Sequence, residues 1–539
     1  MHFIIRRRGE KVAIKNTMIT FDPLSPNFLV DLVSLGQKRG WHYVMSKYFE
    51  SDDRDYFKKL NEIDAKYLEE SGKNMVRALF NKMYFEVPAY KDFLKKNVKG
   101  DMNIDDFHWD DLPIINKDNY LRQYNKEDLV WNSNSNSIHT FSVSSGTSGK
   151  PYFWPRGAVQ EVELSLVLGN MLRYMDIGDD PTLVINTFSM GMYIAGLVVS
   201  NGISRNAEKG MKLEMFTPGI SFDDFFSIIN NINGKYKKII ISGYPPLVKD
   251  FIVESVNQGF NWHDRNIRFI FAAESFNEEW REHIHNLVGT KLDYNTSLNI
   301  YGTADAGILG HETPLSNFIR KKASQNPQLL KQLFNDTRLP SLVQYYPNLK
   351  YFENYKGELI FSSVSGFPLL RYNIQDNGMV ISYNSMLGIL LSFNIDAEKE
   401  MNELGFQFAK LPFVYLFGRM DLTASYYGLN VYPEHIKVGL EKNKEIMNIC
   451  SGKFNMEVNQ DNNFDQHLII KVELNNKLMP TDELRIKISE SIIEALRVNN
   501  KEYNKLLESL GDKVKPRIEL IKYGSDPNFR IGIKHKWNK

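Results

Sequence analysis

Apolar residues recur at helical spacing before the middle of the chain. Between Asn74 and Lys96 the following positions share one face of a 3.6-residue repeat: Met75, Leu79, Met83, Tyr84, Val87, Tyr90 and Phe93. Pro88 interrupts the repeat, because the residue before a proline disfavours helical backbone angles. The pattern therefore predicts two helices that meet near Val87 and Pro88. The residues before about 75 are mixed in character, and we treat residues 1–75 as an N-terminal extension.

Short apolar runs alternate with amphipathic stretches through the middle of the chain. The runs predict buried strands at residues 183–185, 238–241, 267–272 and 298–301, and the amphipathic stretches predict helices at 191–201, 221–232, 247–258 and 278–288. Repeated strand–helix–strand units imply an α/β fold, with a mostly parallel sheet covered by helices on both faces. Ligands of such sheets bind beyond the carboxyl ends of the strands, so functional residues should follow the strands.

A change in composition and a change in hydrophobic pattern divide the rest of the chain. Residues 315–354 are rich in Lys, Gln and Asn and contain Pro340 and Pro347, which suggests an insertion. After Asp421 an alternating strand pattern at 467–474, a helix at 482–496 and a strand at 517–521 predict a small α+β domain. We therefore expect a large domain over residues 76–420, with an insertion at about 315–354, and a small domain over residues 421–539.

Composition and charge exclude several classes of function. The 539 residues are 42% hydrophobic and 24% charged, and 66 Lys and Arg balance 65 Asp and Glu. A net charge of +1 argues against a nucleic acid partner, which usually requires a basic surplus. One cysteine, Cys450, excludes an intramolecular disulfide and a cysteine-based zinc site, and favours a cytoplasmic location. The apolar stretch at residues 190–199 is about half of the ~20 residues that a membrane span needs, so we expect no membrane segment.

The sharpest local motif is rich in glycine and hydroxyl side chains. It consists of Ser145, Gly146, Thr147, Ser148, Gly149 and Lys150, followed by Pro151. Glycines allow the backbone to approach a phosphate closely, and consecutive N–H groups can form an anion-binding nest. Two residues, rather than four, separate the glycines, so the motif is not a Walker A loop. Its composition also fits a flexible surface turn, and the motif alone does not decide between them.

Six further motifs follow in order along the chain. They are Asn-Thr-Phe-Ser-Met-Gly-Met-Tyr-Ile-Ala-Gly-Leu at 186–197, Ala-Ala-Glu-Ser at 272–275, Ile-Tyr-Gly-Thr-Ala-Asp at 300–305, Leu-Arg-Tyr-Asn-Ile-Gln-Asp at 370–376, Gly-Arg-Met-Asp at 418–421 and Tyr-Gly-Leu-Asn-Val-Tyr-Pro at 427–433. With the glycine-rich motif, this set resembles the adenylate-forming (acyl-CoA synthetase) superfamily, and within it the phenylacetate–CoA ligase branch. The resemblance covers about residues 75–525. Some members of that branch hold zinc through Cys and His, which one cysteine does not reproduce.

The resemblance implies roles for residues of the large domain. Residues 145–150 would bind the phosphates of ATP, Ala273, Glu274, Tyr301 and Gly302 would lie beside adenine, and Arg419 would contact ribose or phosphate. Asp376 would accept hydrogen bonds from the ribose hydroxyls, and Thr303 would face the α-phosphate. Asp305 stands where the family has a glutamate that holds Mg²⁺; its shorter side chain leaves a water-bridged contact open. Phe188 and Tyr193 would line an aromatic substrate pocket.

The resemblance also implies roles for the small domain. Lys534, or as second choice Lys536, would bridge the carboxylate and the α-phosphate, although the tail departs from the family's usual spacing. Asp421 would be the hinge, and Gly428 and Val431 would line a channel for the thiol. Several candidates also have a purely structural interpretation: a turn aspartate at Asp376, a surface carboxylate at Glu274, a surface ion pair at Arg419 and a solvated basic tail. His311 is more typical of a hydrogen-bonded structural residue than of a ligand.

Three functions remain open from the sequence. The first is an acid–thiol ligase that activates a small carboxylic acid with ATP and Mg²⁺ as an adenylate and transfers the acyl or aryl group to CoA. The second keeps adenylation but transfers to an amine or to the phosphopantetheine of an acyl carrier protein. The third is a non-catalytic nucleotide-binding homologue. The sequence identifies neither the acid nor the oligomeric state, and a homodimer stays open.

Overall fold

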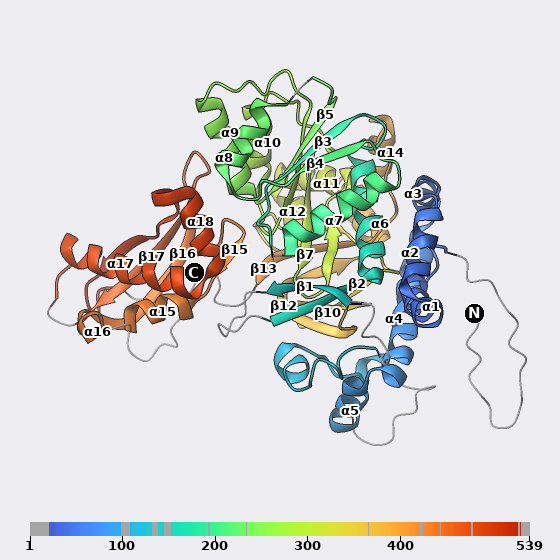
Figure 1. Cartoon of the computed structure of the whole chain (residues 1–539), viewed down its shortest axis with the longest axis horizontal. Coiled ribbons are helices and arrows are strands. Elements are labelled where there is room, and N and C mark those ends of the chain that lie inside the picture. The colour runs from blue at the N-terminus through green and yellow to red at the C-terminus, as the bar shows by residue number, and fades with distance from the viewer. Residues whose placement is uncertain are drawn as a thin grey trace, which may run out of the picture.

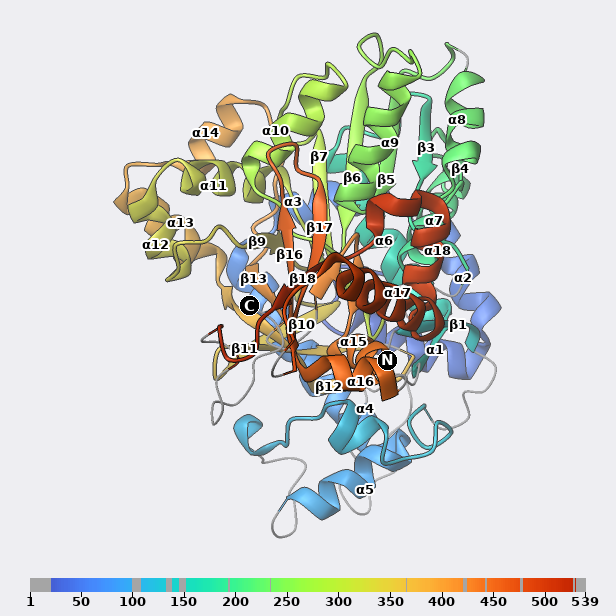
Figure 2. The same cartoon turned by 90° about the vertical axis from the view of Figure 1, so that its left-hand side faces the viewer.

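The computed structural model describes residues 21–98, 108–131, 138–144, 152–191, 194–232, 234–364, 366–419, 424–441, 444–475, 478–526 and 529. A large central body carries N-terminal helices on one side and the small C-terminal domain on the opposite side (Figure 1). The small domain lies across the end of the central sheet, as the turned view shows (Figure 2). No helix in these residue ranges is long and apolar enough to cross a membrane.

Helices form the N-terminal part of the described chain. They are α1 (Phe28–Arg39), α2 (Trp41–Glu50), α3 (Asp53–Glu62), α4 (Ala65–Glu86) and α5 (Pro88–Asn97), with short helical turns at Trp109–Asp111 and Lys117–Leu121. The two helices predicted around Pro88 are confirmed, since α4 ends and α5 begins on either side of Val87. Helix α4 runs unbroken through residue 75, so the N-terminal helices and the large domain share one element. The division into domains stays a prediction.

The central sheet has eleven strands in the described part of the chain. Their order across the sheet is β10 (Lys350–Tyr355), β11 (Glu358–Ser363), β12 (Leu369–Ile381), β13 (Phe413–Arg419), β9 (Ser341–Gln344), β8 (Gly307–His311), β7 (Ser297–Thr303), β6 (Ile267–Ala272), β5 (Lys238–Gly243), β3 (Thr182–Asn186) and β4 (Leu213–Phe216). The pairs from β4 to β7 are parallel, and those from β7 to β10 are antiparallel. The predicted α/β class is confirmed; the sheet is mixed, and its parallel part is the region that the strand–helix pattern identified.

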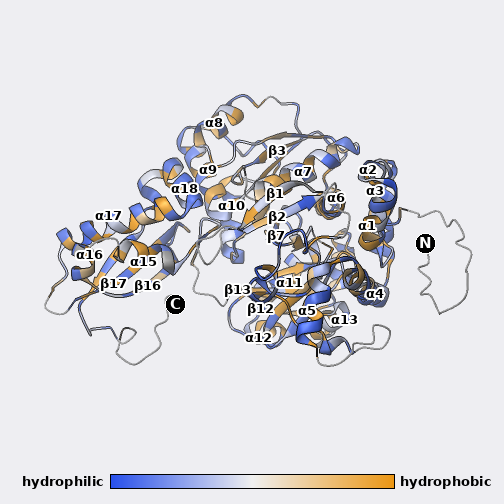
Figure 3. Cartoon of the chain, turned by 60° about the horizontal axis from the view of Figure 1, so that its bottom comes forward, coloured by the Kyte–Doolittle hydropathy of each residue, from blue (hydrophilic) through white to orange (hydrophobic). Residues whose placement is uncertain are grey.

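Alternate residues of the parallel strands pack into two different cores. Val184 and Ile240 face α6 (Ala158–Tyr174) and α7 (Ile194–Glu208), whereas Leu183 and Ile239 face α8 (Phe222–Asn230), α9 (Pro245–Asn257) and α10 (Glu278–Leu287). This alternation follows from the two-residue period of a strand. The helices show both hydrophobic and hydrophilic stretches, as amphipathic covering helices should (Figure 3).

The segment at 315–354 belongs to the central body. It contains α11 (Pro314–Ser324), α12 (Pro327–Phe334) and strands β9 and β10. Strand β9 lies inside the sheet, between β8 and β13. Helices α11 and α12 share a third core with α13 (Tyr383–Ser392) and α14 (Ala397–Glu403). The residues expected to form an insertion thus supply part of the sheet itself.

The remaining elements are a hairpin and the small domain. The hairpin pairs β1 (Ile138–Ser144) with β2 (Tyr152–Gly157). The small domain contains β14 (Ala424–Tyr426), β15 (Leu429–Val431), α15 (Pro433–Glu441), α16 (Lys444–Ile449), β16 (Cys450–Gln460), β17 (Gln466–Leu474), α17 (Asp482–Asn499), α18 (Lys501–Leu510) and β18 (Arg517–Ile521). Strands β16, β17 and β18 form one sheet, packed by helices, so the predicted α+β character is confirmed.

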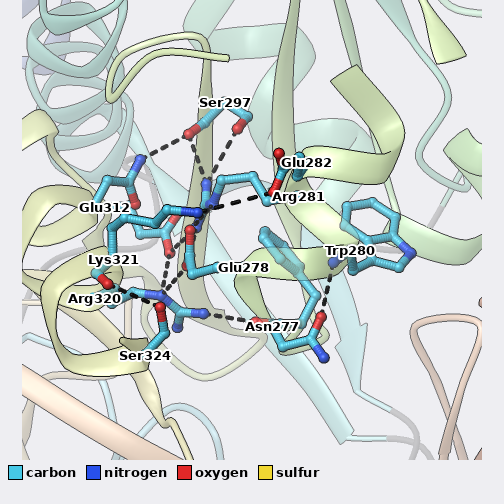
Figure 4. Close-up of polar contacts among 12 residues, drawn as sticks. Asn277, Glu278, Trp280, Arg281, Glu282, Ser297, Glu312, Arg320, Lys321 and Ser324 are labelled. Carbon is cyan, nitrogen blue, oxygen red and sulfur yellow. Dashed lines mark hydrogen bonds and ion pairs between the residues drawn. The ribbon is translucent and has the colours of Figure 1, made fainter. Parts of the chain in front are cut away.

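A buried ionic cluster joins the helices to the middle of the central sheet (Figure 4). Glu278 and Arg281 on α10 meet Glu312 and Arg320, with nitrogen–oxygen distances of 2.8–3.0 Å in the shortest pairs and side chains no more than 4% exposed. Although burial favours the protonated carboxyl, the two arginines lower the pKa of Glu278 below its ordinary value. The second oxygen of Glu312 accepts a hydrogen bond from the backbone N–H of Asn299 on β7, at 2.8 Å. The cluster therefore fixes α10, β7 and α11 relative to one another.

We expect Arg281→Met to destabilise the protein strongly. The substitution leaves two buried carboxylates with fewer partners, which typically costs about 3–5 kcal/mol. Arg54→Met is the control, because the Arg54–Asp179 pair has side chains 71% and 85% exposed. Such an exposed pair contributes about 0–1 kcal/mol. Urea unfolding measures both variants, and similar free energies of unfolding for the two would contradict the role given to the cluster.

Candidate functional site

One cavity of about 730 Å³ lies between the large domain and the small domain. Its wall includes the ends of β6 and β7, which are carboxyl ends of parallel strands, where the strand–helix pattern placed the functional residues. The sequence-predicted residues that line it are Phe188, Ala273, Glu274, Tyr301, Gly302, Thr303, Asp305, Asp376 and Gly428. Residues from five separate motifs are thus brought together in one cavity.

Two tyrosine–aspartate pairs cross between β7 and β12. Tyr301 donates its hydroxyl hydrogen bond to Asp376 at 2.6 Å, and Tyr372 donates to Asp305 at 2.6 Å. Each motif thus supplies one tyrosine and, four residues later, one aspartate, and each tyrosine contacts the other motif's aspartate. All four residues are less than 9% exposed. This reciprocal arrangement fixes both carboxylates at the cavity wall.

Strand β12 reaches this geometry through an irregular backbone. Arg371 and Gln375 have positive φ angles of 51° and 67°, a region that non-glycine residues occupy rarely. The register with β11 also shifts between Leu359 and Ile360. Such conformations persist where the surrounding structure holds them, and they gather at functional sites. The backbone of Arg419 pairs opposite Asp376, while its side chain lies outside the described residues.

Lys117 brings a positive charge to the same end of the cavity. Its ammonium nitrogen lies 3.3 Å from an oxygen of Asp305 and 5.4 Å from the centre of the Trp154 ring. Arg156 donates to the carbonyl of Ala304 at 2.7 Å and to the hydroxyl of Ser142 at 3.0 Å, so it ties the turn before Asp305 to the β1–β2 hairpin. These contacts place two cations beside a turn that carries a buried carboxylate.

The metal expectation rests on Asp305. Over the described residues, no group of three or more His, Cys, Asp or Glu side chains is arranged to hold a metal ion. Mg²⁺ in nucleotide sites is often bound by only one or two carboxylates together with substrate phosphates. Asp305 fits that kind of site as one carboxylate on the cavity wall, where Mg²⁺ would replace the Lys117 ammonium as its partner.

Glu274 connects the cavity wall to the small domain. Its carboxylate accepts hydrogen bonds from the backbone N–H of Gly428 and from the side-chain amide of Gln466. Burial raises the pKa of Glu274 to about 7, although these two donors act to lower it. Ala273, just before it, has a φ of 72° and is exposed in the cavity. Glu274 was expected beside adenine, and that role stays a prediction; in the structure its carboxylate is joined to the small domain.

Gly428 occupies a position that requires glycine. Its φ is 76°, and a Cβ there would lie 2.2 Å from the ring of Tyr244. The Tyr244 ring packs edge-on against Phe188 at 5.0 Å, and Ile194, Val198 and Val199 of α7 continue this apolar end of the cavity. Val431 differs from expectation: it is fully buried in the small-domain core and does not line the cavity.

Several expected residues cannot be placed. Ser145, Gly146, Thr147, Ser148, Gly149, Lys150, Tyr193, Asp421, Lys534 and Lys536 lie outside the described residues. His311 is described and fully buried; its ring nitrogens contact the carbonyl of Glu312 at 2.6 Å and the hydroxyl of Tyr346 at 2.9 Å. It does not line the cavity, which agrees with the structural interpretation of this histidine.

The sequence did not identify Lys117, Tyr372, Arg156 and Tyr244. Tyr372 lies in the motif at 370–376, four residues before Asp376, and this proximity in the sequence could have marked it as a site residue. Lys117 sits on a helical turn that begins with Asn116, whose side chain accepts from the backbone N–H groups of Asp118 and Asn119. This local cap is visible in the sequence, but nothing in it shows that the lysine faces a cavity more than a hundred residues away in the chain.

Comparisons with known proteins identify the fold. No protein-family model and no curated protein sequence matches the chain. Among solved structures, the chain is similar to 2-hydroxyisobutyryl-CoA ligase in complex with 2-HIB-AMP and CoA in the thioesterification state, with 14% identity, a TM-score of 0.59, and coverage of 88% of this chain and 90% of that chain. An open conformation of the same ligase has a TM-score of 0.49 at 14% identity, covering 88% and 92%. The amide bond synthetase McbA from Marinactinospora thermotolerans has a TM-score of 0.43 at 11% identity, covering 72% and 67%. The first of these shows that the chain has the fold of that CoA ligase.

The raised pKa of Glu274 makes stability depend on pH. Burial favours the protonated carboxyl, so its pKa is about 7 in the folded protein against an ordinary value of 4.5. The protonated Glu274 carboxyl thus contributes roughly 3 kcal/mol to the free energy of unfolding. This contribution is fully present below about pH 4.5 and is lost as the pH rises through about 7. We expect Glu274→Gln to remove this dependence. Urea unfolding over that pH range tests it, and a wild type and variant with parallel pH profiles would contradict it.

Proposed function

We propose that the protein activates a carboxylic acid with ATP to form an acyl or aryl adenylate, and then transfers the acyl group to the thiol of CoA. The observation that carries this proposal is the shared cavity, where the paired Tyr301–Asp376 and Tyr372–Asp305 contacts face Gly428 of the small domain. A nucleotide-binding wall and an acceptor-facing loop in one cavity are what two successive half-reactions require. The fold, shared with a CoA ligase, supports the same conclusion.

The lining of the cavity supports a division into subsites. Asp376 would bind the ribose, since a carboxylate can accept further hydrogen bonds besides the one from Tyr301. Thr303 and Lys117 lie near Asp305, where the phosphates would bind. The apolar end formed by Phe188, Tyr244 and α7 suits an aryl or medium-length acyl group. A phenylacetate-like acid is therefore the substrate class that we propose.

The chemistry requires positioning and charge neutralisation from this chain. A carboxylate oxygen of the substrate attacks the α-phosphorus of ATP, and the bond to the β-phosphate oxygen breaks to release pyrophosphate. Lys117 stabilises negative charge that develops on the phosphates, and its effect is strong because the cavity is partly shielded from water. Asp305, together with the phosphates, would hold Mg²⁺, which would supply additional charge neutralisation. The thiol sulfur then attacks the carbonyl carbon, and AMP leaves.

The alternative acceptor is a carrier-protein phosphopantetheine or an amine. The small domain faces the cavity with uncharged amides, Asn430, Asn459, Gln460 and Gln466, and with Glu502. Amides can hydrogen-bond the amide groups of a pantetheine arm, whether it belongs to CoA or to a carrier protein. The transfer assay therefore compares CoA, a carrier protein and an amine as acceptors. Lys534, with Lys536 as second choice, stays our proposal for the lysine of the adenylation step.

Pyrophosphate exchange tests the proposed function. We expect exchange with at least one acid of an aromatic and fatty acid panel, followed by transfer to CoA. Asp376→Ala should weaken ATP binding, because the ribose loses charge-assisted hydrogen bonds that contribute about 1.5–3 kcal/mol each. An unchanged ATP dissociation constant in this variant would contradict the ribose contact. Absence of exchange with every acid would contradict adenylation, and transfer only to a carrier protein or an amine would favour the alternative acceptor.

Lys126 is a matched control for Lys117, because both lysines lie over aromatic rings of the β1–β2 hairpin. Lys126 lies 4.9 Å over the ring of Phe153, much as Lys117 lies over Trp154, but only Lys117 lines the cavity. We expect Lys117→Met to slow pyrophosphate exchange by about tenfold or more, because it removes a contact to charged phosphates. Lys126→Met should leave the rate unchanged. Equal rates for the two variants would show that Lys117 does not act on the phosphates.

A further inference from the structure

Four charged side chains cross the boundary between the large domain and the small domain. Lys249 and Asp250 belong to α9 of the large domain, and Asp465 and Lys513 belong to the small domain. Lys249 lies 2.8 Å from Asp465, Asp250 lies 2.5 Å from Lys513, and Lys513 also lies 3.1 Å from Asp465. The charges alternate in sign across the boundary, so each cation has an acidic partner.

Further contacts make this cluster specific for one orientation of the small domain. Lys249 also donates to the carbonyl of Asn463 at 2.6 Å, and the hydroxyl of Tyr427 donates to Asp250 at 2.9 Å. Lys249 and Asp250 are only 3% and 4% exposed. Buried charges are stable only with partners, so this orientation depends on contacts that the opposite domain supplies. When the domains separate, water can hydrate the same groups, which makes such contacts reversible.

The orientation that these contacts hold presents the acceptor side of the small domain to the cavity. Tyr427 directly precedes Gly428, whose N–H donates to Glu274 at the cavity wall. Residues 458–460, at one end of β16, line the cavity. Phe529, the last described residue, is instead held by Lys453, which donates to its carbonyl. Lys453 precedes Val458 by five positions, or about 17 Å along an extended strand. The described end of the chain is therefore anchored away from the cavity.

We propose that Lys249, Asp250, Asp465 and Lys513 form an interdomain latch that holds the small domain in the orientation for transfer to the acceptor. This inference rests on the proposed two-step function. On the proposed function, Lys534 or Lys536 of the small domain acts in adenylation, and we infer that the latch opens for that step and closes for transfer. The strength of the latch then sets the balance between the two half-reactions.

Neutral substitutions test the latch by separating the two half-reactions. We expect Lys249→Met and Asp465→Asn to slow transfer from a preformed adenylate by about 5-fold to 150-fold, the usual range of such couplings, with pyrophosphate exchange unchanged or faster. The double variant should lose less than the product of the two single losses, because the two side chains share the Lys249–Asp465 contact while each also has a contact of its own. Lys513→Met, at a side chain 38% exposed, gives a milder variant if the buried substitutions impair folding.

The matched control is Lys471→Met. Lys471 forms an ion pair with Glu457 at 2.9 Å, with side chains 22% and 17% exposed, and both residues belong to the small domain. This variant should leave the ratio of transfer to exchange unchanged. If latch variants and control change both half-reactions by the same factor, or if transfer is unaffected in the latch variants, the latch is refuted.

Hydrogen–deuterium exchange gives a readout that does not depend on activity. The N–H of Gly428 is hydrogen-bonded across the boundary, so the peptide that contains it should exchange faster in the latch variants than in the wild type or in Lys471→Met. Equal exchange in all of them would refute the latch. A wild type that catalyses neither half-reaction would refute the proposed function, and the exchange of this peptide would then decide the latch by itself.

Discussion

The buried ionic cluster of Glu278, Arg281, Glu312 and Arg320 is the constraint on which the site depends. Four charges that are almost completely buried must be paired with good geometry, so the elements that carry them have little freedom. Arg281 also donates to the carbonyl of Ser297, and Arg320 donates to the carbonyls of Phe276 and Pro340. Asn299, held through Glu312, donates in turn to the carbonyl of Glu274 at 3.0 Å. The cluster therefore supports the cavity wall from behind.

On this support, the antiparallel half of the sheet brings β12 to the end of β7. The two crossed tyrosine–aspartate contacts need both strands at once, so neither carboxylate is positioned by its own motif alone. The strained backbone at Arg371 and Gln375 is part of the same arrangement, since it lets one strand present Tyr372 and Asp376 together. Both halves of the mixed sheet thus form the cavity wall: the parallel half supplies the strand ends, and the antiparallel half supplies the second carboxylate.

The contacts that Glu274, Lys249 and Asp250 make across the boundary with the small domain are polar. Glu274, Lys249 and Asp250 contact the small domain through hydrogen bonds and ion pairs. The Phe464 ring adds a contact to His283, with ring centres 5.0 Å apart. Polar contacts of this kind are directional and exchange readily with water, so they define an orientation without making it permanent. The proposed function, with two successive steps, would need that combination from the small domain.

The sequence by itself determined the α/β class, the parallel strands with their helices, the α+β small domain and the motif residues, because hydrophobic periodicity and local motifs are properties of neighbouring positions. It also indicated that Tyr301, Asp305 and Asp376 share a site, through motif order. Only the tertiary structure decided what these residues touch. Lys117 reaches Asp305, Tyr372 crosses to the other motif, Glu274 turns to the small domain, and Val431 is buried. These contacts join residues far apart in the chain, and their distances depend on packing and charge pairing that no local pattern records.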